Sequence, residues 1–147
     1  MKMTNEDYIK YASGKVPPSP LWSNMLKAFL VGGLICCVGQ GLMQLYEGSG
    51  LEQTDASTAT SVTLVFIGAL LTGLGVYDDM AKFAGAGTLV PITGFANSVV
   101  SPALEFKSEG YVTGVAAKMF VIAGPVIVFG ISASVIYGLV LMLFGLA

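Results

Sequence analysis

The sequence predicts an all-α polytopic membrane protein with three full transmembrane helices, a broken or re-entrant helical segment at 83–104 and a kinked helix at Gly124–Pro125. Two observations carry this prediction. Only 11% of the 147 residues are charged, 54% are hydrophobic and the mean hydropathy is +0.78, whereas a soluble domain carries roughly 25% charged residues. The apolar residues also fall into stretches that approach the roughly 20 residues needed to cross a bilayer. A fourth full span, in place of the broken segment, is the alternative.

Two regions are expected, a polar tail at 1–25 and a single membrane domain at 26–147. In the tail, Thr4 and Asp7 match a capping-box pattern, which predicts a short surface helix from Thr4 to about Ala12. The prolines within 17–20 would end this helix, because proline lacks a backbone donor. A mobile cytosolic tail is the alternative.

The first predicted span runs from about 26 to 46. Trp22 and Tyr46 flank it and would lie roughly 36 Å apart in a helix, which suits the aromatic belts of the two membrane surfaces. Small residues at helical spacing predict a smooth stripe on which another helix packs: Gly33, Cys37 and Gly41. Gln40 and Gln44 lie beside this stripe, and the alternative to helix packing is that they line a pore.

The second predicted span, at 58–77, follows a lysine-free acidic loop at 48–55. Its smooth side consists of Gly68, Thr72 and Gly75. We interpret the adjacent Asp78 and Asp79 that follow as an interfacial helix end, with attraction of cations as an alternative. Adjacent helical residues point about 100° apart, so this pair does not make the dyad of an intramembrane aspartyl protease.

The segment at 83–104 is uncharged and long enough to cross a bilayer, but Pro91 and Pro102 interrupt it and three glycines loosen its backbone. Interrupted backbone is tolerated at membrane depth only where protein buries it or where it lines a watery cavity, and discontinuous helices hold the cargo of many transporters. We therefore expect the pore or cargo path at this segment and just after it. The candidate residues are Thr88, Pro91, Thr93, Asn97, Ser98, Ser101, Glu105, Lys107 and Glu109. The alternative is that their polar groups only satisfy freed backbone carbonyls.

A tilted or interfacial helix at 110–123 and a final span at 126–144 complete the chain. The apolar run from 119 to 147 is longer than one span needs, and the kink predicted at Gly124–Pro125 explains the excess. Small residues four positions apart predict a second helix-packing stripe on the final span: Gly130, Ser134 and Gly138.

Lysine placement predicts the orientation. The lysines before residue 28 place the N-terminus on the cytosolic side, and the acidic loop then lies outside. Lys82, Lys107 and Lys118 favour the cytosolic side, so the segment at 83–104 would dip into the membrane and return, and the C-terminus would lie outside. In the alternative, the segment crosses fully and the C-terminus lies inside.

The residue types present exclude several functions. The chain has no histidine and no arginine, which removes Ser-His and Cys-His catalysis and the usual histidine metal sites. We therefore expect a protein that is not an enzyme and has no cofactor or metal site. A net charge of −2 offers no basic surface for nucleic acid. Cys36 and Cys37 are adjacent within the first span, where we interpret them as small packing residues.

Three sequence blocks resemble the stage V sporulation protein AC/AE family of spore-forming Firmicutes. They are GAGTLVPITGFANSVVSPALEFKSEG at 85–110, KAFLVGGLICCVGQ at 27–40 and LLTGLGVYD at 70–78. The first block is specific to that family, and the blocks extend over most of the membrane part. The leader before Lys27 and the LEFKSEG at 104–110 resemble the AC-type members.

The resemblance implies transport. It implies a subunit of the SpoVA complex of the inner spore (forespore) membrane, which moves dipicolinic acid, largely as its calcium chelate, in sporulation and releases it in germination. The AC type is linked to a mechanosensitive, channel-like activity. The implied partners are the AE-type membrane subunit and the soluble AD-type protein, and a homo-oligomer surrounded by membrane lipid is a further expectation. The alternative function is a non-conducting scaffold that assembles the other SpoVA subunits.

Overall fold

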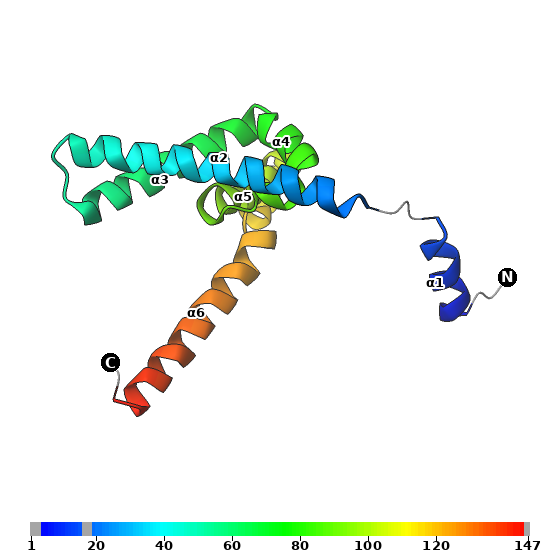
Figure 1. Ribbon diagram of the computed structural model, residues 1–147. Helices are drawn as coiled ribbons and strands as arrows, with labels where there is room; N and C mark the ends of the chain where they lie inside the picture. The colour runs from blue at the N-terminus through cyan, green and yellow to red at the C-terminus, as the bar shows by residue number, and fades with distance from the viewer. Residues whose placement is uncertain (1–3, 16–18, 146–147) are drawn as a thin grey trace.

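The structure is a computed structural model that describes residues 4–15 and 19–145 (Figure 1). Every regular element in these two ranges is a helix. The helices are α1 Asn5–Ser13, α2 Leu21–Gly48, α3 Gln53–Gly73, α4 Val76–Ala84, the 3-10 helix η1 Gly85–Thr88, α5 Pro91–Glu105, the 3-10 helix η2 Lys107–Glu109, the π-helix η3 Tyr111–Ala116 and α6 Phe120–Leu143. The predicted all-α class is confirmed.

Three stretches in the described part of the chain are long and apolar enough to cross a membrane, as the sequence predicts. They are α2, α3 and the run Tyr111–Leu143, which contains η3 and α6. By contrast, α5 has 15 residues and is about 22 Å long at 1.5 Å per residue, whereas the hydrocarbon core is about 30 Å thick. The broken segment is therefore not a fourth full span.

α2 and α3 form a helical hairpin closed by the short loop between them (Figure 1). Near the loop, the hydroxyl groups of Tyr46 and Thr63 lie 2.7 Å apart and form a hydrogen bond between the two helices. α3 ends at Gly73, whereas the sequence predicts a span to residue 77. The reason is Gly75, whose φ of +75° is a left-handed conformation that residues with a Cβ rarely adopt. Tyr77 therefore belongs to α4 and not to the second span.

Contacts along α2 and α3 define the course of the broken segment. Gly87 in η1 packs against Ala28 of α2, in the half of α2 that precedes the hairpin. Near the start of α5, Thr93 packs against Gly68 of α3, and one turn later Asn97 lies 3.0 Å from the Thr72 hydroxyl near the end of α3. α5 thus runs parallel to the second half of α3, so the segment leaves the hairpin at the end where it entered. This is a re-entrant course.

The third span begins with irregular backbone. After Gly110, with a φ of +100°, the chain forms the wide π-turn of η3, whose buried Gly114 packs against the Phe106 carbonyl oxygen. α6 then runs through Pro125 as one helix. The boundary predicted at Gly124–Pro125, between helices at 110–123 and 126–144, is therefore misplaced, because the helix absorbs the proline and the irregular turn lies earlier. A bend of the helix axis at Pro125 stays a prediction.

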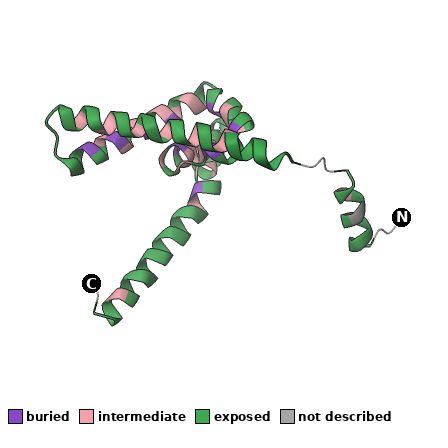
Figure 2. Cartoon of the chain, in the orientation of Figure 1, coloured by how far each residue is buried: buried purple, intermediate pink, exposed green. Residues whose placement is uncertain are grey.

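Few of the described residues are buried against other parts of the chain (Figure 2). Six apolar residues form the buried core of the described part. Leu64, Tyr77, Ala84 and Ala96 belong to α3, α4 and α5, whereas Ala56 lies in the first turn of α3 and Ala123 lies near the start of α6. α6 diverges from the hairpin and is exposed along almost its whole length (Figures 1 and 2). Lipid or other protein must therefore cover most of this molecule, because apolar surface of this extent is rare on a soluble monomer.

The N-terminal region holds one short helix. The structure places α1 at Asn5–Ser13, where Thr4 Oγ1 donates to the Asp7 carboxylate at 2.7 Å and accepts from the Asp7 backbone N–H at 3.3 Å. Part of the proline run predicted to end this helix, at 17–18, lies outside the described residues, as does Lys2 of the orientation prediction. That α1 lies on a membrane surface stays a prediction.

Candidate functional site

A buried tyrosine joins the two sides of the break, by which we mean the non-helical turn at 89–90 between η1 and α5. Tyr77 on α4 is 2% exposed. Its hydroxyl donates to the Thr88 carbonyl oxygen at 2.7 Å and lies 3.3 Å from Thr93 Oγ1. Because the tyrosine hydroxyl has a single proton to donate, the shorter bond to the Thr88 carbonyl oxygen is the main one and the contact with Thr93 Oγ1 is the weaker one. We call these three residues the Tyr77 lock, because they hold α4, the end of η1 and the start of α5 together.

A second polar contact joins α5 to α3. The Thr72 hydroxyl donates to the Gly68 carbonyl oxygen at 2.7 Å and lies 3.0 Å from Asn97 Oδ1. Gly68 allows this approach, because a Cβ there would lie 3.3 Å from both the Cα and the carbonyl oxygen of Thr93. No buried side-chain nitrogen or oxygen lacks a hydrogen-bond partner in the part of the chain that the structure describes.

The predicted path residues therefore divide into two groups. Thr88 and Thr93 are buried in the lock, and the Thr88 hydroxyl also donates to the Gly85 carbonyl oxygen at 3.0 Å. For Thr88 this contact matches the alternative in which polar side chains satisfy broken backbone, whereas the Thr93 hydroxyl contacts the Tyr77 side chain. Asn97 is half-buried against α3, and Pro91 is the exposed first residue of α5.

The outward side of α5 carries the second group. Ser101 and Glu105 are exposed, and Ser98 is partly exposed with its hydroxyl donating to the Phe95 carbonyl oxygen at 2.8 Å. Spacings of three and four residues place Ser98, Ser101 and Glu105 on one side of the helix, and we call this side the polar face of α5. Lys107 and Glu109 follow in η2 and are exposed. The polar face thus runs to the end at which the segment leaves the hairpin.

A cavity of about 270 Å³ lies beside the start of α5. Val90 and Ile92, on either side of Pro91, border it together with apolar residues of α2 and α3. Its polar lining consists of Gln40 on α2 and Ser57, Thr60 and Ser61 on α3. The first turn of a helix has free backbone N–H groups and a partial positive charge of about half a unit, so this cavity suits an anion. The structure thus brings Gln40, but not Gln44, to the break.

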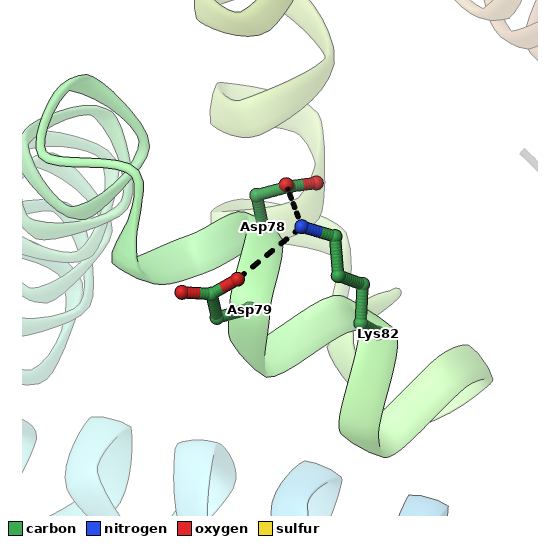
Figure 3. A network of polar contacts seen from close by, with 3 residues as sticks. All are labelled: Asp78, Asp79 and Lys82. Carbon is green, nitrogen blue, oxygen red and sulfur yellow. Dashed lines mark hydrogen bonds and ion pairs between the residues drawn. The ribbon is translucent and has the colours of Figure 1, made fainter.

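The outer side of α4 carries a charged cluster (Figure 3). The Lys82 ammonium lies 2.7 Å from an Asp78 carboxylate oxygen and 3.3 Å from one of Asp79. The hydrogen bond to Asp78 raises the pKa of Lys82 above its ordinary value, and the bond to Asp79 adds to this shift. All three side chains are largely exposed, so the cluster contributes little to stability. Among the described residues, no three histidine, cysteine or acidic side chains are grouped closely enough to hold a metal ion.

The predicted helix-packing residues take three different positions. Gly68 is buried between α3 and α5, whereas Gly75 forms the turn into α4 and has no neighbour that a Cβ would meet. The others are exposed to the outside of the chain: Gly33, Cys37, Gly41, Gly130, Ser134 and Gly138. A contact through these two outer stripes would have to be made with another molecule, and it stays a prediction.

The sequence analysis does not identify several residues that organise the break. Tyr77 was placed at the end of a span, although the glycine at 75 is a common helix-stop signal and would have assigned it to a new helix. The close contact of Gly87 with Ala28 and Gly32 was also missed, because the packing prediction used Gly33, one position away. No local signal identifies Lys118, whose ammonium lies 4.3 Å from the centre of the Phe106 ring.

Residues 24–140 match the model of the SpoVAC/SpoVAEB sporulation membrane protein family. Stage V sporulation protein AC of Bacillus subtilis (strain 168) is 52% identical to this chain over 141 residues, which are 94% of each of the two proteins. No solved structure matches the chain. The matched residues include the hairpin, the broken segment and most of the third span.

Proposed function

The chain belongs to the SpoVAC/SpoVAEB family of sporulation membrane proteins, and from this premise we propose that it is a subunit of a channel or transport complex for dipicolinate in the inner spore membrane. The complex loads dipicolinate, with calcium, during sporulation and releases it in germination. This chain contributes the re-entrant segment to the conducting path, and the path opens under membrane tension.

The observation that carries this proposal is the position of α5. It is a half-helix that starts beside a cavity of about 270 Å³ with a partly polar lining, and it ends at Glu105 with its polar face uncovered by this chain. Half-helix termini next to cavities are where many transporters bind their cargo.

The chemistry of dipicolinate suits this arrangement. Dipicolinate is a planar ring with two carboxylates, and the free N–H groups at the start of α5 attract an anion without arginine. The Gln40 amide can donate to a carboxylate from the opposite side of the cavity, while the apolar lining accepts the ring. Glu105 and Glu109 at the other end suit the calcium that accompanies dipicolinate, because carboxylate oxygens are its preferred ligands.

One chain is too small to enclose a conduit, so we propose that partner subunits complete it. The polar face of α5 opens to the outside of the chain, and α6 has almost no neighbour in it. The AE-type membrane subunit is the proposed cover for the polar face, and a second copy of this chain is the alternative. The AD-type protein is the proposed soluble partner.

Dipicolinate flux from proteoliposomes tests the proposed function. We expect release when this chain and the AE-type subunit are reconstituted together, with faster release under hypo-osmotic stress. This chain alone should release little, because the polar face is then uncovered. Absence of flux from the pair at any tension, in vesicles that hold both folded subunits, would contradict the proposal and favour the non-conducting scaffold.

Substitution of two polar residues distinguishes a conducting subunit from a non-conducting scaffold. We expect Asn97→Ala and Glu105→Ala each to lower the dipicolinate content of spores, because each removes a polar group from the α5 path, while the amount of protein in the membrane is unchanged. Dipicolinate content is measured in purified spores and protein by immunoblot. Asp79→Ala, a carboxylate removed from the exposed side of α4, is the control. Wild-type content in both path variants would remove these residues from the path.

The orientation gives a further prediction. Because the segment is re-entrant, we propose that Lys107 lies on the same side of the membrane as the N-terminus, for which lysine placement favours the cytosolic side. A cysteine introduced as Lys107→Cys, in a chain with Cys36→Ser and Cys37→Ser, should react with an impermeant thiol reagent only from the cytosolic side in oriented vesicles. Reaction only from the opposite side would show that the segment crosses the membrane fully.

A further inference from the structure

We propose that α4 is a hinged lever, latched by the Tyr77 hydroxyl, whose movement uncovers the start of α5. The proposal deepens the proposed function, on which it rests for the consequence of the movement; the movement itself concerns only this chain. It follows from three features of α4: the backbone at its two ends, the contacts of its inward side and the cavity beside its tyrosine.

Glycines bound α4 on both sides. Gly75 precedes it with a φ of +75°, and Gly85 follows it with a φ of +54° and a ψ of −120°. Other residues rarely adopt these conformations. No heavy atom lies within 4 Å of the position of a Cβ at either glycine, so close packing does not explain them. Short elements that end in such residues are typical of hinges, where a few residues absorb the change in backbone angles.

The inward side of α4 has a single polar attachment to the break. Tyr77 and Ala84 are its two buried residues, and only the tyrosine makes hydrogen bonds, to Thr88 and Thr93. The outward side carries Asp78, Asp79 and Lys82 in solvent-exposed ion pairs that lie within α4 itself. Phe83, near the end of α4, makes a contact with α2, because the Lys27 ammonium lies 4.9 Å from the centre of its ring. The tyrosine is therefore the contact that couples α4 to α5.

A cavity lies beside the Tyr77 lock. A cavity of about 170 Å³ is bordered by Tyr77 and Met80 of α4, by Thr93 of α5 and by apolar residues of α2 and α3. Tyr77 is 2% exposed, so its ring is packed while the hydrogen bonds hold, and the cavity is the space into which the ring can shift. When it shifts, the Thr88 carbonyl and the Thr93 hydroxyl lose their partner and become available to water or to a passing solute.

Cysteine labelling in the absence of cargo tests the lever. Ala84 is 3% exposed on the inward side of α4, so Ala84→Cys, in the full chain with Cys36→Ser and Cys37→Ser, reports when α4 lifts. We expect Tyr77→Phe to raise the labelling rate about fivefold, the order of effect expected when one hydrogen bond is removed and the ring is kept. Tyr46→Phe is the matched control, because it removes a tyrosine–threonine hydrogen bond of 2.7 Å within the α2–α3 hairpin.

The outcomes separate the lever from the proposed function. A higher labelling rate in Tyr77→Phe but not in Tyr46→Phe supports the lever. Equal rates in Tyr77→Phe and the wild type, or equal increases in both variants, would overturn it. Thr93→Val removes only the longer contact and should give a smaller increase in the labelling rate. It also provides the test if Tyr77→Phe does not fold. An unchanged labelling rate in Thr93→Val would then overturn the proposal. Dipicolinate flux is measured separately, so a failed flux experiment leaves the labelling result standing.

Discussion

Replacing Gly87 with alanine should lower the free energy of unfolding by about 1–3 kcal/mol or more, the cost of inserting a group into close-packed structure. A Cβ at this position would lie 2.5 Å from the Ala28 carbonyl oxygen and 2.7 Å from the Ala28 Cα. Both atoms belong to the backbone of α2, so neither can move aside without bending that helix. We therefore expect η1 to detach from α2 and the break to lose its position, with loss of dipicolinate from spores.

Gly33→Ala is the matched control for this prediction. Gly33 lies on the same helix as Ala28, and no heavy atom lies within 4 Å of a Cβ placed there. Alanine is favoured over glycine in a helix interior by about 1 kcal/mol, so this variant should be at least as stable as the wild type. Denaturant titration of the purified chains in detergent gives the comparison. Equal stability of Gly87→Ala and Gly33→Ala would show that η1 does not pack against α2 as described.

The second large effect is expected from the polar face of α5. Ser98→Leu combined with Ser101→Leu replaces two small polar groups with bulky apolar ones on the side that we propose to line the path. Dipicolinate release by the reconstituted pair of subunits should fall to the background rate. The fold should persist, because Ser101 is exposed and Ser98 bonds only to its own helix at the Phe95 carbonyl oxygen.

Thr58→Leu is the control for the replacement of a small polar side chain by leucine. Thr58 is an exposed residue of α3 whose hydroxyl donates to the Thr54 carbonyl oxygen of its own helix at 3.0 Å, and it lies away from α5. Release should stay at the wild-type rate in this variant. Wild-type release by the double serine variant would mean that the polar face is not part of the conducting path.

The spans and the break were predictable because each has a local cause. Three apolar runs of sufficient length define the spans, and Pro91 with the glycines at 85 and 87 prevents a single rod between 83 and 104. The interruption predicted at Pro102 is wrong, because α5 runs through Gly94 and Pro102 as one helix. The re-entrant course followed from lysines on both sides of that segment, which favour the same side of the membrane. These signals depend on composition and short spacing, and neither requires knowledge of what packs against what.

The organisation of the site was less predictable, because it depends on contacts between distant residues. Thr88 and Thr93 look like Ser98 and Ser101 in the sequence, yet the first two are buried against Tyr77 and the other two face outward. What separates Thr93 from the two serines is the side of α5 that packs against α3 and Tyr77, which spacing in the sequence does not reveal. The glycine stripes had the same weakness: spacing selected Gly68, which lies between α3 and α5, and equally selected Gly33 and Gly130, which no described part of this chain covers.

The most direct test of the central claim is whether water and dipicolinate reach the polar face of α5. The measurement is the reaction of Ser101→Cys with an impermeant thiol reagent, in the reconstituted pair of subunits and with the native cysteines replaced by serine. Val128→Cys, exposed on α6, is the lipid-facing control. We predict that position 101 reacts, that dipicolinate slows the reaction, and that position 128 stays unlabelled. An unreactive position 101, matching position 128, would contradict a conducting path along α5.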